Sequence, residues 1–243
     1  MHKAGSWSRP KIAIETDCAT RHHPLAFAKR NSRMNFLCRL ALLAVLAGFS
    51  QHAAAADISG LIALLKQGGY MLIFRHTATD DSQKDIYPYK FDDMSAQRQL
   101  SEKGRDVARQ IGMAIKELAI PVGDVYTSRL NRAIETGKLI TGHEVKPLDA
   151  LTDSSNASAS GMANPAGANA KVGQAVRQLI DVPPKAGTNT VLITHKTNIA
   201  DAFGKEAGDV QEGEAFIYKA DGLGPAAFVG RIKVADWPVK ASK

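Results

Sequence analysis

Two histidines stand directly after apolar runs that are typical of buried parallel strands. The run YMLIF is followed at once by Arg75 and His76, and His195 follows the run TVLIT. A third segment, SRLNRAIET, is polar, contains Arg132 and begins directly after the short run that ends at Thr127. In an open α/β sheet, ligand-binding residues lie outside the carboxyl ends of the strands. The three segments are therefore expected to meet at one edge of a sheet.

Histidines and arginines in this arrangement fit phosphoryl transfer. A neutral imidazole can attack phosphorus at pH 7 and form a phosphohistidine that water then hydrolyses. Guanidinium groups, here Arg75 beside His76 and Arg132 in the third segment, offer paired donors to phosphate oxygens and stabilise the transition-state charge. This chemistry requires neither a metal nor a cofactor, and we expect none.

The elements that must position these residues follow from hydrophobic periodicity. Apolar spacing and capping signals predict helices over 58–67, 101–118, 130–140 and 172–180. Continuous apolar runs predict strands over 70–74, 124–127 and 190–194. Polar segments without periodicity predict long loops over 77–100 and 151–170, and a late hairpin is predicted from 214–219 and 227–234. This alternation predicts an α/β fold, a three-layer sandwich with a mostly parallel central sheet and helices on both faces.

Three segments in this order resemble the histidine phosphatase superfamily, also called phosphoglycerate mutase-like. They are LIFRHTAT around His76, TSRLNRAIET around Arg132 and LITHKTN around His195. Two further stretches, QRQLSEKGR at 97–105 and EGEA at 212–215, resemble an exported bacterial branch of that superfamily. One Arg-His pair alone would be weak evidence, whereas three ordered segments, each at a strand end, are specific.

The resemblance implies roles for four residues. His76 would be the nucleophile, and Arg75 beside it would be a phosphate ligand. Arg132 would be the second phosphate-binding arginine, and His195 would complete the pocket by binding the phosphate.

The chain departs from the superfamily pattern at two positions. A glycine usually follows each histidine, but this chain has Thr77 and Lys196 there. Thr77 is expected only to change backbone freedom. Lys196 could add a cation near the phosphate or point to solvent.

The proton donor is expected in a loop after the second arginine. Related proteins often supply it from a Leu-x-Glu setting, and Leu-Thr-Asp153 matches that setting with Asp in place of Glu. Asp80, Asp85 or Glu214 could serve instead. A solvated surface group is the ordinary state of any single carboxylate in a loop.

Three further residues lie near the motifs. Thr79 could give a hydroxyl to the phosphate or form an ordinary turn. Arg129 competes with Arg132 for the pocket, but the spacing favours Arg132 and leaves Arg129 as an outer ligand. His143, at a helix end with no motif around it, is expected to be a surface histidine.

The N-terminal segment 34–56 has the three-part plan of a secretory signal peptide. A short basic start at Met34 is followed by an apolar run over 40–49 and by small residues that end at Ala56. The run is shorter than the about 20 residues that a transmembrane helix needs. Residues 1–33 are expected to be upstream sequence read through in error, or a disordered extension. Cleavage after Ala56 would remove both cysteines and leave one histidine phosphatase-like domain over 57–243.

The net charge of the chain is concentrated in its N-terminal segment. The sequence holds 31 basic residues against 24 acidic ones, a formal net charge of +7. Residues 1–56 contain eight of the basic and two of the acidic residues, so 57–243 carry a net charge of about +1. A nucleic-acid partner is not expected, because it requires basic residues clustered on the folded domain.

These observations predict a periplasmic or secreted phosphomonoesterase. The expected substrate is a small phosphomonoester or a phosphorylated glycan, because some exported relatives resemble enzymes that remove phosphate from lipopolysaccharide core sugars. No stable membrane insertion is expected after signal cleavage. The alternatives are a non-catalytic phosphate-binding protein, which the departures at Thr77 and Lys196 would mark, and a phosphomutase, whose usual substrates are cytosolic.

Overall fold

The computed structural model describes residues 57–155 and 169–238. The predicted signal peptide over 34–56 and the segment 1–33 lie outside the described residues, as does most of the predicted loop over 151–170. Within the described residues, no helix has the length and apolar content to cross a membrane.

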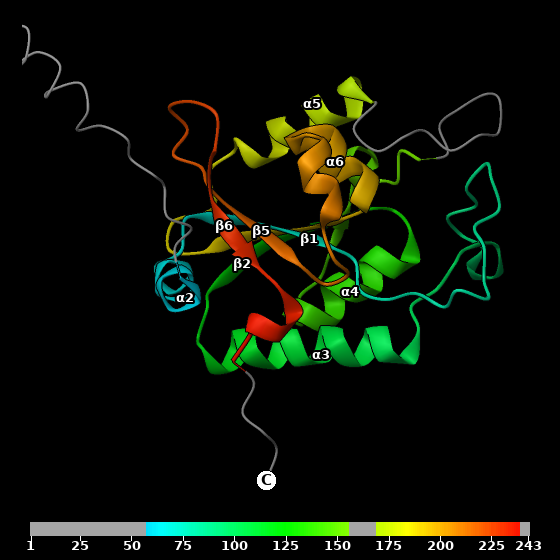
Figure 1. The fold of residues 1–243 in the computed structure, drawn as a ribbon, viewed down its shortest axis with the longest axis horizontal. Helices are drawn as coiled ribbons and strands as arrows, with labels where there is room; N and C mark the ends of the chain where they lie inside the picture. Colours follow the sequence, from blue (N-terminus) through cyan, green and yellow to red (C-terminus); the bar gives the residue numbers. More distant parts are fainter. Residues whose placement is uncertain (1–56, 156–168, 239–243) are drawn as a thin grey trace, which may run out of the picture. The chain divides into compact units, whose positions relative to one another are not determined.

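Six strands form one sheet, in the order β3-β2-β4-β1-β5-β6. Figure 1 labels β1, β2, β5 and β6 of this sheet. The strands are β1 (Tyr70–Arg75), β2 (Val122–Thr127), β3 (Lys146–Pro147), β4 (Asn189–Thr194), β5 (Ala215–Lys219) and β6 (Ala227–Ile232). β4 pairs in parallel with both β1 and β2, and β2 pairs in parallel with β3. β5 runs antiparallel to β1 and β6, which confirms the predicted hairpin. The sheet is therefore mostly parallel, as predicted.

The helices follow the predicted segments closely. They are α2 (Ile58–Gln67), α3 (Glu102–Glu117), α4 (Asn131–Thr141), α5 (Ala170–Ile180) and α6 (Lys196–Phe203). Short 3-10 turns occupy Met94–Ala96, Asp149–Leu151, Lys205–Asp209 and Val234–Asp236. Ser101, the serine that predicted the start of α3, caps this helix, because its hydroxyl accepts a hydrogen bond from Gly104 N at 3.1 Å.

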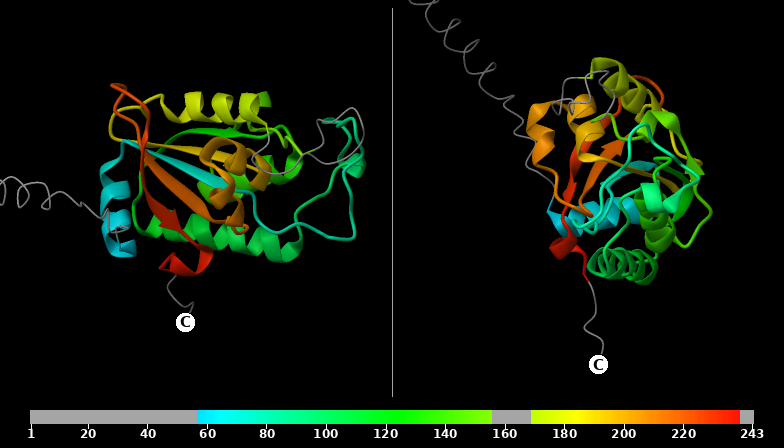
Figure 2. Two further views of the ribbon diagram at one scale, coloured as in Figure 1. Left: turned by 45° about the horizontal axis from the view of Figure 1, so that its top comes forward. Right: turned by 90° about the vertical axis from the view of Figure 1, so that its right-hand side faces the viewer.

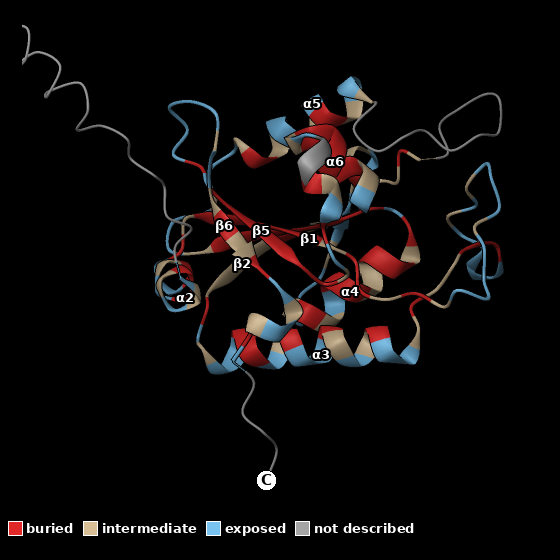
Figure 3. Ribbon diagram, viewed as in Figure 1, coloured by how far each residue is buried: buried red, intermediate tan, exposed pale blue. Residues whose placement is uncertain are grey.

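Helices cover both faces of the sheet, which confirms the three-layer sandwich (Figure 2). Along β1, Leu72 and Phe74 point into a core that α2, α3 and α4 cover. Met71 and Ile73 point into a second core, on the side of α5 and α6. Because both faces are buried, the central strands are apolar along their whole length, and Figure 3 shows them as the buried centre of the domain.

Three elements differ from the prediction. β2 begins at Val122, two residues before the predicted start. α6 was not predicted, because its eight residues are too few to show a reliable helical period. β3 was not predicted either, because its two residues pair with Tyr126 and Thr127 without a pattern of their own.

Asn189 joins four segments at the end of the sheet where β4 begins. Its side chain is fully buried, and its Oδ1 accepts a hydrogen bond from Tyr70 N at 3.1 Å. Its Nδ2 donates to Leu65 O at 2.7 Å and to Pro121 O at 2.9 Å. One side chain therefore satisfies three backbone groups that belong to β1, α2 and the segment before β2.

Replacing Asn189 with alanine should destabilise the fold, because it leaves these backbone groups without their partner. We expect Asn189→Ala to lower the free energy of unfolding by about 2–4 kcal/mol. Urea unfolding measures this change. The neighbouring Thr188→Ala loses one exposed hydrogen bond, to Lys185 O, and should cost less than about 1 kcal/mol. Equal losses for the two variants would contradict this role of Asn189.

Candidate active site

The parallel register brings the predicted site residues to one edge of the sheet. Arg75 lies opposite Thr194 in the β1–β4 pair, and Thr127 lies opposite Ile193 in the β2–β4 pair. Just beyond the strands, His76 N donates to Thr194 O at 3.0 Å, and Ser128 N donates to Ile193 O at 2.9 Å. The rings of His76 and His195 consequently stand edge to face, with their centroids 5.1 Å apart.

One hydrogen bond determines the tautomer of His76. Its Nδ1 lies 2.8 Å from Thr77 O, and a carbonyl oxygen can only accept, so Nδ1 carries the hydrogen. The lone pair is therefore on Nε2. Burial, followed by the charges of His195 and Arg132, holds the pKa of His76 well below its ordinary value of 6.5. The imidazole is neutral at physiological pH.

His195 is held by Ser128, a residue that sequence reasoning did not single out. His195 Nε2 lies 2.8 Å from Ser128 Oγ, and the same oxygen accepts a hydrogen bond from Leu130 N. His195 Nδ1 is buried and has no partner among the described residues. Burial lowers the pKa of His195 to about 3, against the opposing effect of Asp153. Ser128 could have been predicted as a site residue from its position directly after the strand that ends at Thr127.

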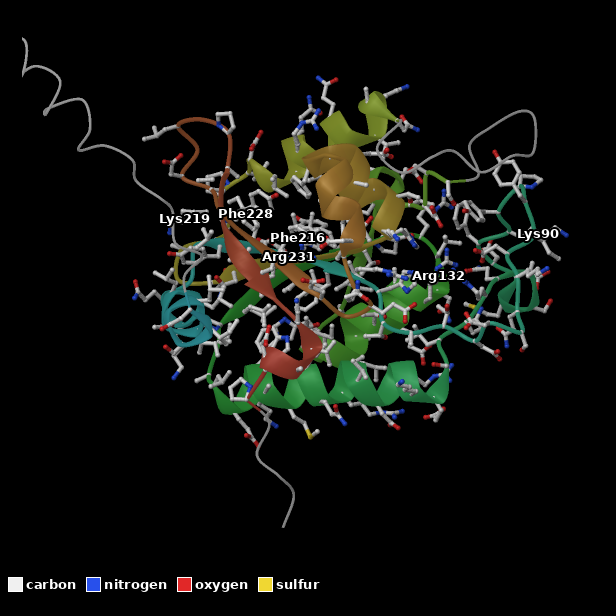
Figure 4. All side chains as sticks on the ribbon, viewed as in Figure 1. Lys90, Arg132, Phe216, Lys219, Phe228 and Arg231 are labelled. Carbon is white, nitrogen blue, oxygen red and sulfur yellow. The ribbon has the colours of Figure 1, made fainter. Side chains whose placement is uncertain are left out.

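Arg132 is fully buried in the first turn of α4, at the end of the sheet that faces loop 77–100 (Figure 4). Its Nη1 donates to Asp85 Oδ1 at 2.9 Å, and its Nη2 donates to Asp153 Oδ2 at 3.3 Å. Its Nε has no partner among the described residues.

Arg75 is held by the segment before β5. Its Nη1 donates to Val210 O at 3.0 Å, and its Nη2 donates to Glu212 Oε1 at 3.1 Å. Its Nε is buried without a described partner, like Arg132 Nε and His195 Nδ1. The two arginine nitrogens are donors, and His195 Nδ1 is a donor in the tautomer in which the Ser128 hydroxyl donates to Nε2. Buried donors are rarely left unpaired in native proteins, so these nitrogens indicate a site for an anion.

Asp153 reaches the same cluster from the loop after α4. Its Oδ1 accepts hydrogen bonds from Ser155 N at 2.9 Å and from Thr197 Oγ1 at 2.8 Å, and its Oδ2 lies 3.9 Å from His195 Nδ1. Burial alone would raise the pKa of Asp153, but His195 and the hydrogen bonds from Ser155 and Thr197 hold it well below its usual range. Asp153 is therefore ionised in the unliganded protein.

The other candidate acids lie in different surroundings. Asp85 contacts Arg132, as described above, and is mostly buried. Asp80 caps a turn by accepting hydrogen bonds from the backbone and hydroxyl of Ser82. Glu214 is fully buried, where it accepts from Arg231 Nε at 2.7 Å and from Gln211 N at 2.8 Å. Of the four predicted acids, the structure brings Asp153 and Asp85 to Arg132.

The two departures from the superfamily pattern are accommodated differently. Thr77 is buried, and its hydroxyl lies 3.2 Å from Thr136 Oγ1. It needs no glycine conformation, because Ala119 is the only non-glycine residue with positive φ in the described part of the chain. Lys196 is exposed and makes no hydrogen bond or ion pair with a described residue, consistent with a side chain that points to solvent.

The remaining predicted residues lie at the margin of the cluster. Thr79 is buried, and its backbone forms an isolated bridge with Leu100. Arg129 pairs with Asp149 at 3.1 Å and stacks 3.9 Å above the ring of Phe91. His143 is exposed, as predicted.

The whole cluster can therefore bind a tetrahedral anion and attack it. Unpartnered nitrogens of two arginines and one histidine are available to an anion, and His76 Nε2 offers a lone pair at the same edge of the sheet. Over residues 57–155 and 169–238, no group of three histidine, cysteine, aspartate or glutamate side chains is spaced to hold a metal ion.

Comparison with known proteins gives one sequence family and several solved structures. Among curated proteins, no sequence match is found. The protein histidine phosphatase SixA, solved with tungstate, is 15% identical with a TM-score of 0.47, over 69% of this chain and 98% of that one. A phosphoserine phosphatase from Entamoeba histolytica is 13% identical with a TM-score of 0.47, over 70% and 99%. A mycobacterial glucosyl-3-phosphoglycerate phosphatase is 14% identical with a TM-score of 0.48, over 66% and 96%.

The family match falls on the part of the fold that builds the site. The histidine phosphatase superfamily, branch 1, matches residues 71–191, which contain His76, Arg132 and Asp153 and end shortly before His195. The match agrees with the three motifs and with the edge of the sheet at which they meet. This chain belongs to the histidine phosphatase superfamily.

Proposed function

We propose that this protein is a phosphomonoesterase that works through a phosphohistidine on His76. The observation that carries the proposal is the hydrogen bond from His76 Nδ1 to Thr77 O, which leaves the lone pair on Nε2 in a buried, neutral ring. A neutral imidazole is a competent nucleophile at pH 7. The unpartnered Nε donors of Arg75 and Arg132 supply the positive surroundings that a phosphoryl group needs.

The reaction has two displacements at phosphorus. In the first, His76 Nε2 forms a bond to phosphorus, the bond from phosphorus to the leaving oxygen breaks, and Asp153 gives that oxygen a proton. In the second, Asp153 takes a proton from water, the water oxygen bonds to phosphorus, and the bond from phosphorus to Nε2 breaks. The two arginines hold the phosphoryl oxygens throughout, where charge develops in both transition states.

Asp153 must gain a proton to act as the acid. It is ionised in the unliganded protein, because His195 and the hydrogen bonds from Ser155 and Thr197 lower its pKa against the effect of burial. A phosphate dianion bound beside it opposes that ionisation, since like charges at close range raise the pKa of a carboxyl group. Substrate binding thus favours the protonated carboxyl that the first displacement uses. Asp85, which shares Arg132 with Asp153, is the alternative acid.

Export and a phosphorylated surface sugar as the substrate are part of the proposal. The signal-like segment over 34–56 supports export, and the resemblance of the stretches 97–105 and 212–215 to exported members supports the substrate class. N-terminal sequencing of protein from its native host tests cleavage after Ala56, and a panel of sugar phosphates tests the substrate. A phosphate-binding protein would bind phosphate without turnover, and a phosphomutase would move the phosphate between positions.

Removing the nucleophile should abolish turnover. We expect His76→Ala to lower kcat by at least about a thousandfold on any phosphomonoester, because the covalent step is lost. A phosphohistidine is labile in acid and stable in base. An alkaline quench of the wild type during turnover should therefore preserve a phosphoprotein, and exposure to acid should release its phosphate. The exposed His143→Ala is the matched control and should keep the wild-type rate. A His76→Ala rate near wild type would require another nucleophile.

Removing the general acid should slow hydrolysis more for a substrate with a poor leaving group than for one with a good leaving group. We expect Asp153→Asn to slow hydrolysis of a sugar phosphate by about 10²- to 10⁴-fold. It should slow p-nitrophenyl phosphate much less, because nitrophenolate leaves without a proton. Asp85→Asn, which loses the other carboxylate on Arg132, is the comparison variant. If Asp85→Asn alone shows the selective loss, the acid is Asp85; equal losses on both substrates exclude Asp153 as the donor.

The lowered pKa of His76 predicts activity at acid pH. A histidine with the ordinary pKa of 6.5 is about 3% neutral at pH 5, so its nucleophilic rate would fall about thirtyfold from the neutral plateau. Because the pKa of His76 lies well below 6.5, the neutral form persists to lower pH and the loss should be smaller. The measurement is kcat/KM for p-nitrophenyl phosphate between pH 5 and 7, corrected for the titration of the substrate. A thirtyfold fall would show that His76 titrates normally.

A further inference from the structure

Arg98 is the one arginine in the described part of the chain whose side chain has no hydrogen-bond or ion-pair partner. The other seven donate to carboxylates or carbonyls: Arg75, Arg105, Arg109, Arg129, Arg132, Arg177 and Arg231. Arg98 is only partly buried, and it lies in loop 77–100, the loop that also carries Asp85. An unpaired guanidinium beside a pocket of buried donors is available to an anion.

The loop holds Arg98 beside the site through backbone and neighbouring contacts. Arg98 N donates at 2.9 Å to Asp85 Oδ1, the same oxygen that accepts Arg132 Nη1. The buried side chain of Gln97 accepts from Asn131 N at 2.9 Å and so ties the loop to the start of α4. These contacts do not use the side chain of Arg98, which leaves its guanidinium free.

The charge of Arg98 lowers the pKa values of two residues of the site, Arg75 and His195. Burial is the largest cause that lowers the pKa of Arg75, and the charge of Arg98 lowers it further, against Glu212. For His195, the charges of Arg132 and Arg98 both add to the effect of burial. These effects agree with the hydrogen bond by which Arg98 N is held on Asp85, beside Arg132.

The carboxylates of the site outnumber the two arginines that pair with them, so the charge of Arg98 affects the net charge that a phosphate would meet. The cations Arg75 and Arg132 are matched by three carboxylates, those of Glu212, Asp85 and Asp153. His76 and His195 are neutral, because burial lowers both pKa values. Without Arg98 the pocket would carry a net negative charge before any phosphate entered it.

From these observations we propose that Arg98 is a third phosphate-binding arginine, supplied by loop 77–100, and that its charge offsets the excess of carboxylates around Arg75 and Arg132. The inference rests on the proposed function and extends it. Its guanidinium donates to a non-bridging oxygen of the phosphoryl group, in addition to the donors of Arg75, Arg132 and His195. Binding should therefore depend on Arg98 whatever the leaving group is.

The test is the affinity of the full chain for inorganic phosphate, measured by calorimetry. We expect Arg98→Gln to weaken phosphate binding roughly ten- to a hundredfold, the loss expected for one charge-assisted contact. Arg98→Lys keeps the charge but loses the planar pair of donors, so its affinity should lie between those of wild type and Arg98→Gln. Arg109→Gln, an exposed change of the same charge on α3, should stay within about twofold of wild type.

The outcomes separate this inference from the proposed function. If the wild type binds no phosphate, both are wrong. If the wild type binds phosphate and folded Arg98→Gln binds it within twofold, the role of Arg98 is wrong and the proposed function stands. If Arg98→Gln raises KM only for substrates with a second anionic group, Arg98 contacts the leaving group and the phosphoryl assignment is overturned. Circular dichroism and urea unfolding establish that each variant is folded.

Discussion

The buried guanidinium of Arg132 is the interaction on which the organisation of the site depends. A fully buried charge is costly unless it is paired and hydrogen-bonded, and Arg132 has Asp85 and Asp153 as partners. These two carboxylates come from different loops, one before α3 and one after α4. Pairing with Arg132 therefore draws both loops to the start of α4 and, with them, the candidate acid and Arg98.

Burial has a second consequence, which concerns the histidines. Desolvation keeps His76 and His195 neutral, so His76, the proposed nucleophile, needs no general base to activate it. The same low-dielectric surroundings strengthen the effect of the neighbouring arginine charges on an incoming phosphate. Burial of the cluster would thus support both halves of the proposed chemistry, a neutral nucleophile and strongly held phosphoryl oxygens. His195 in turn depends on Ser128, whose hydroxyl holds its ring.

Much of the fold could be predicted because its signals are local. The central strands β1 and β4 are continuous apolar runs, since both faces of the sheet are covered, and α3 begins at a capping serine before a clear helical period. The short helix α6 and the two-residue strand β3 lack such signals, because both are held by tertiary packing. The motifs around His76, Arg132 and His195 could be found for the same reason, since each is a short stretch at the end of an element.

The sequence by itself determined the class of fold, the family and the edge of the sheet at which the three motifs meet, because strand patterns and motifs are properties of adjacent residues. Only the tertiary structure decided which carboxylates reach the site. Asp85 and Asp153 meet Arg132 across separations of 47 and 21 residues, whereas Glu214 is committed to Arg231 and Asp80 to a turn. Ser128 and His195 are 67 residues apart. The physical reason is that partner choice depends on where long loops are held in space, and no local pattern encodes that position.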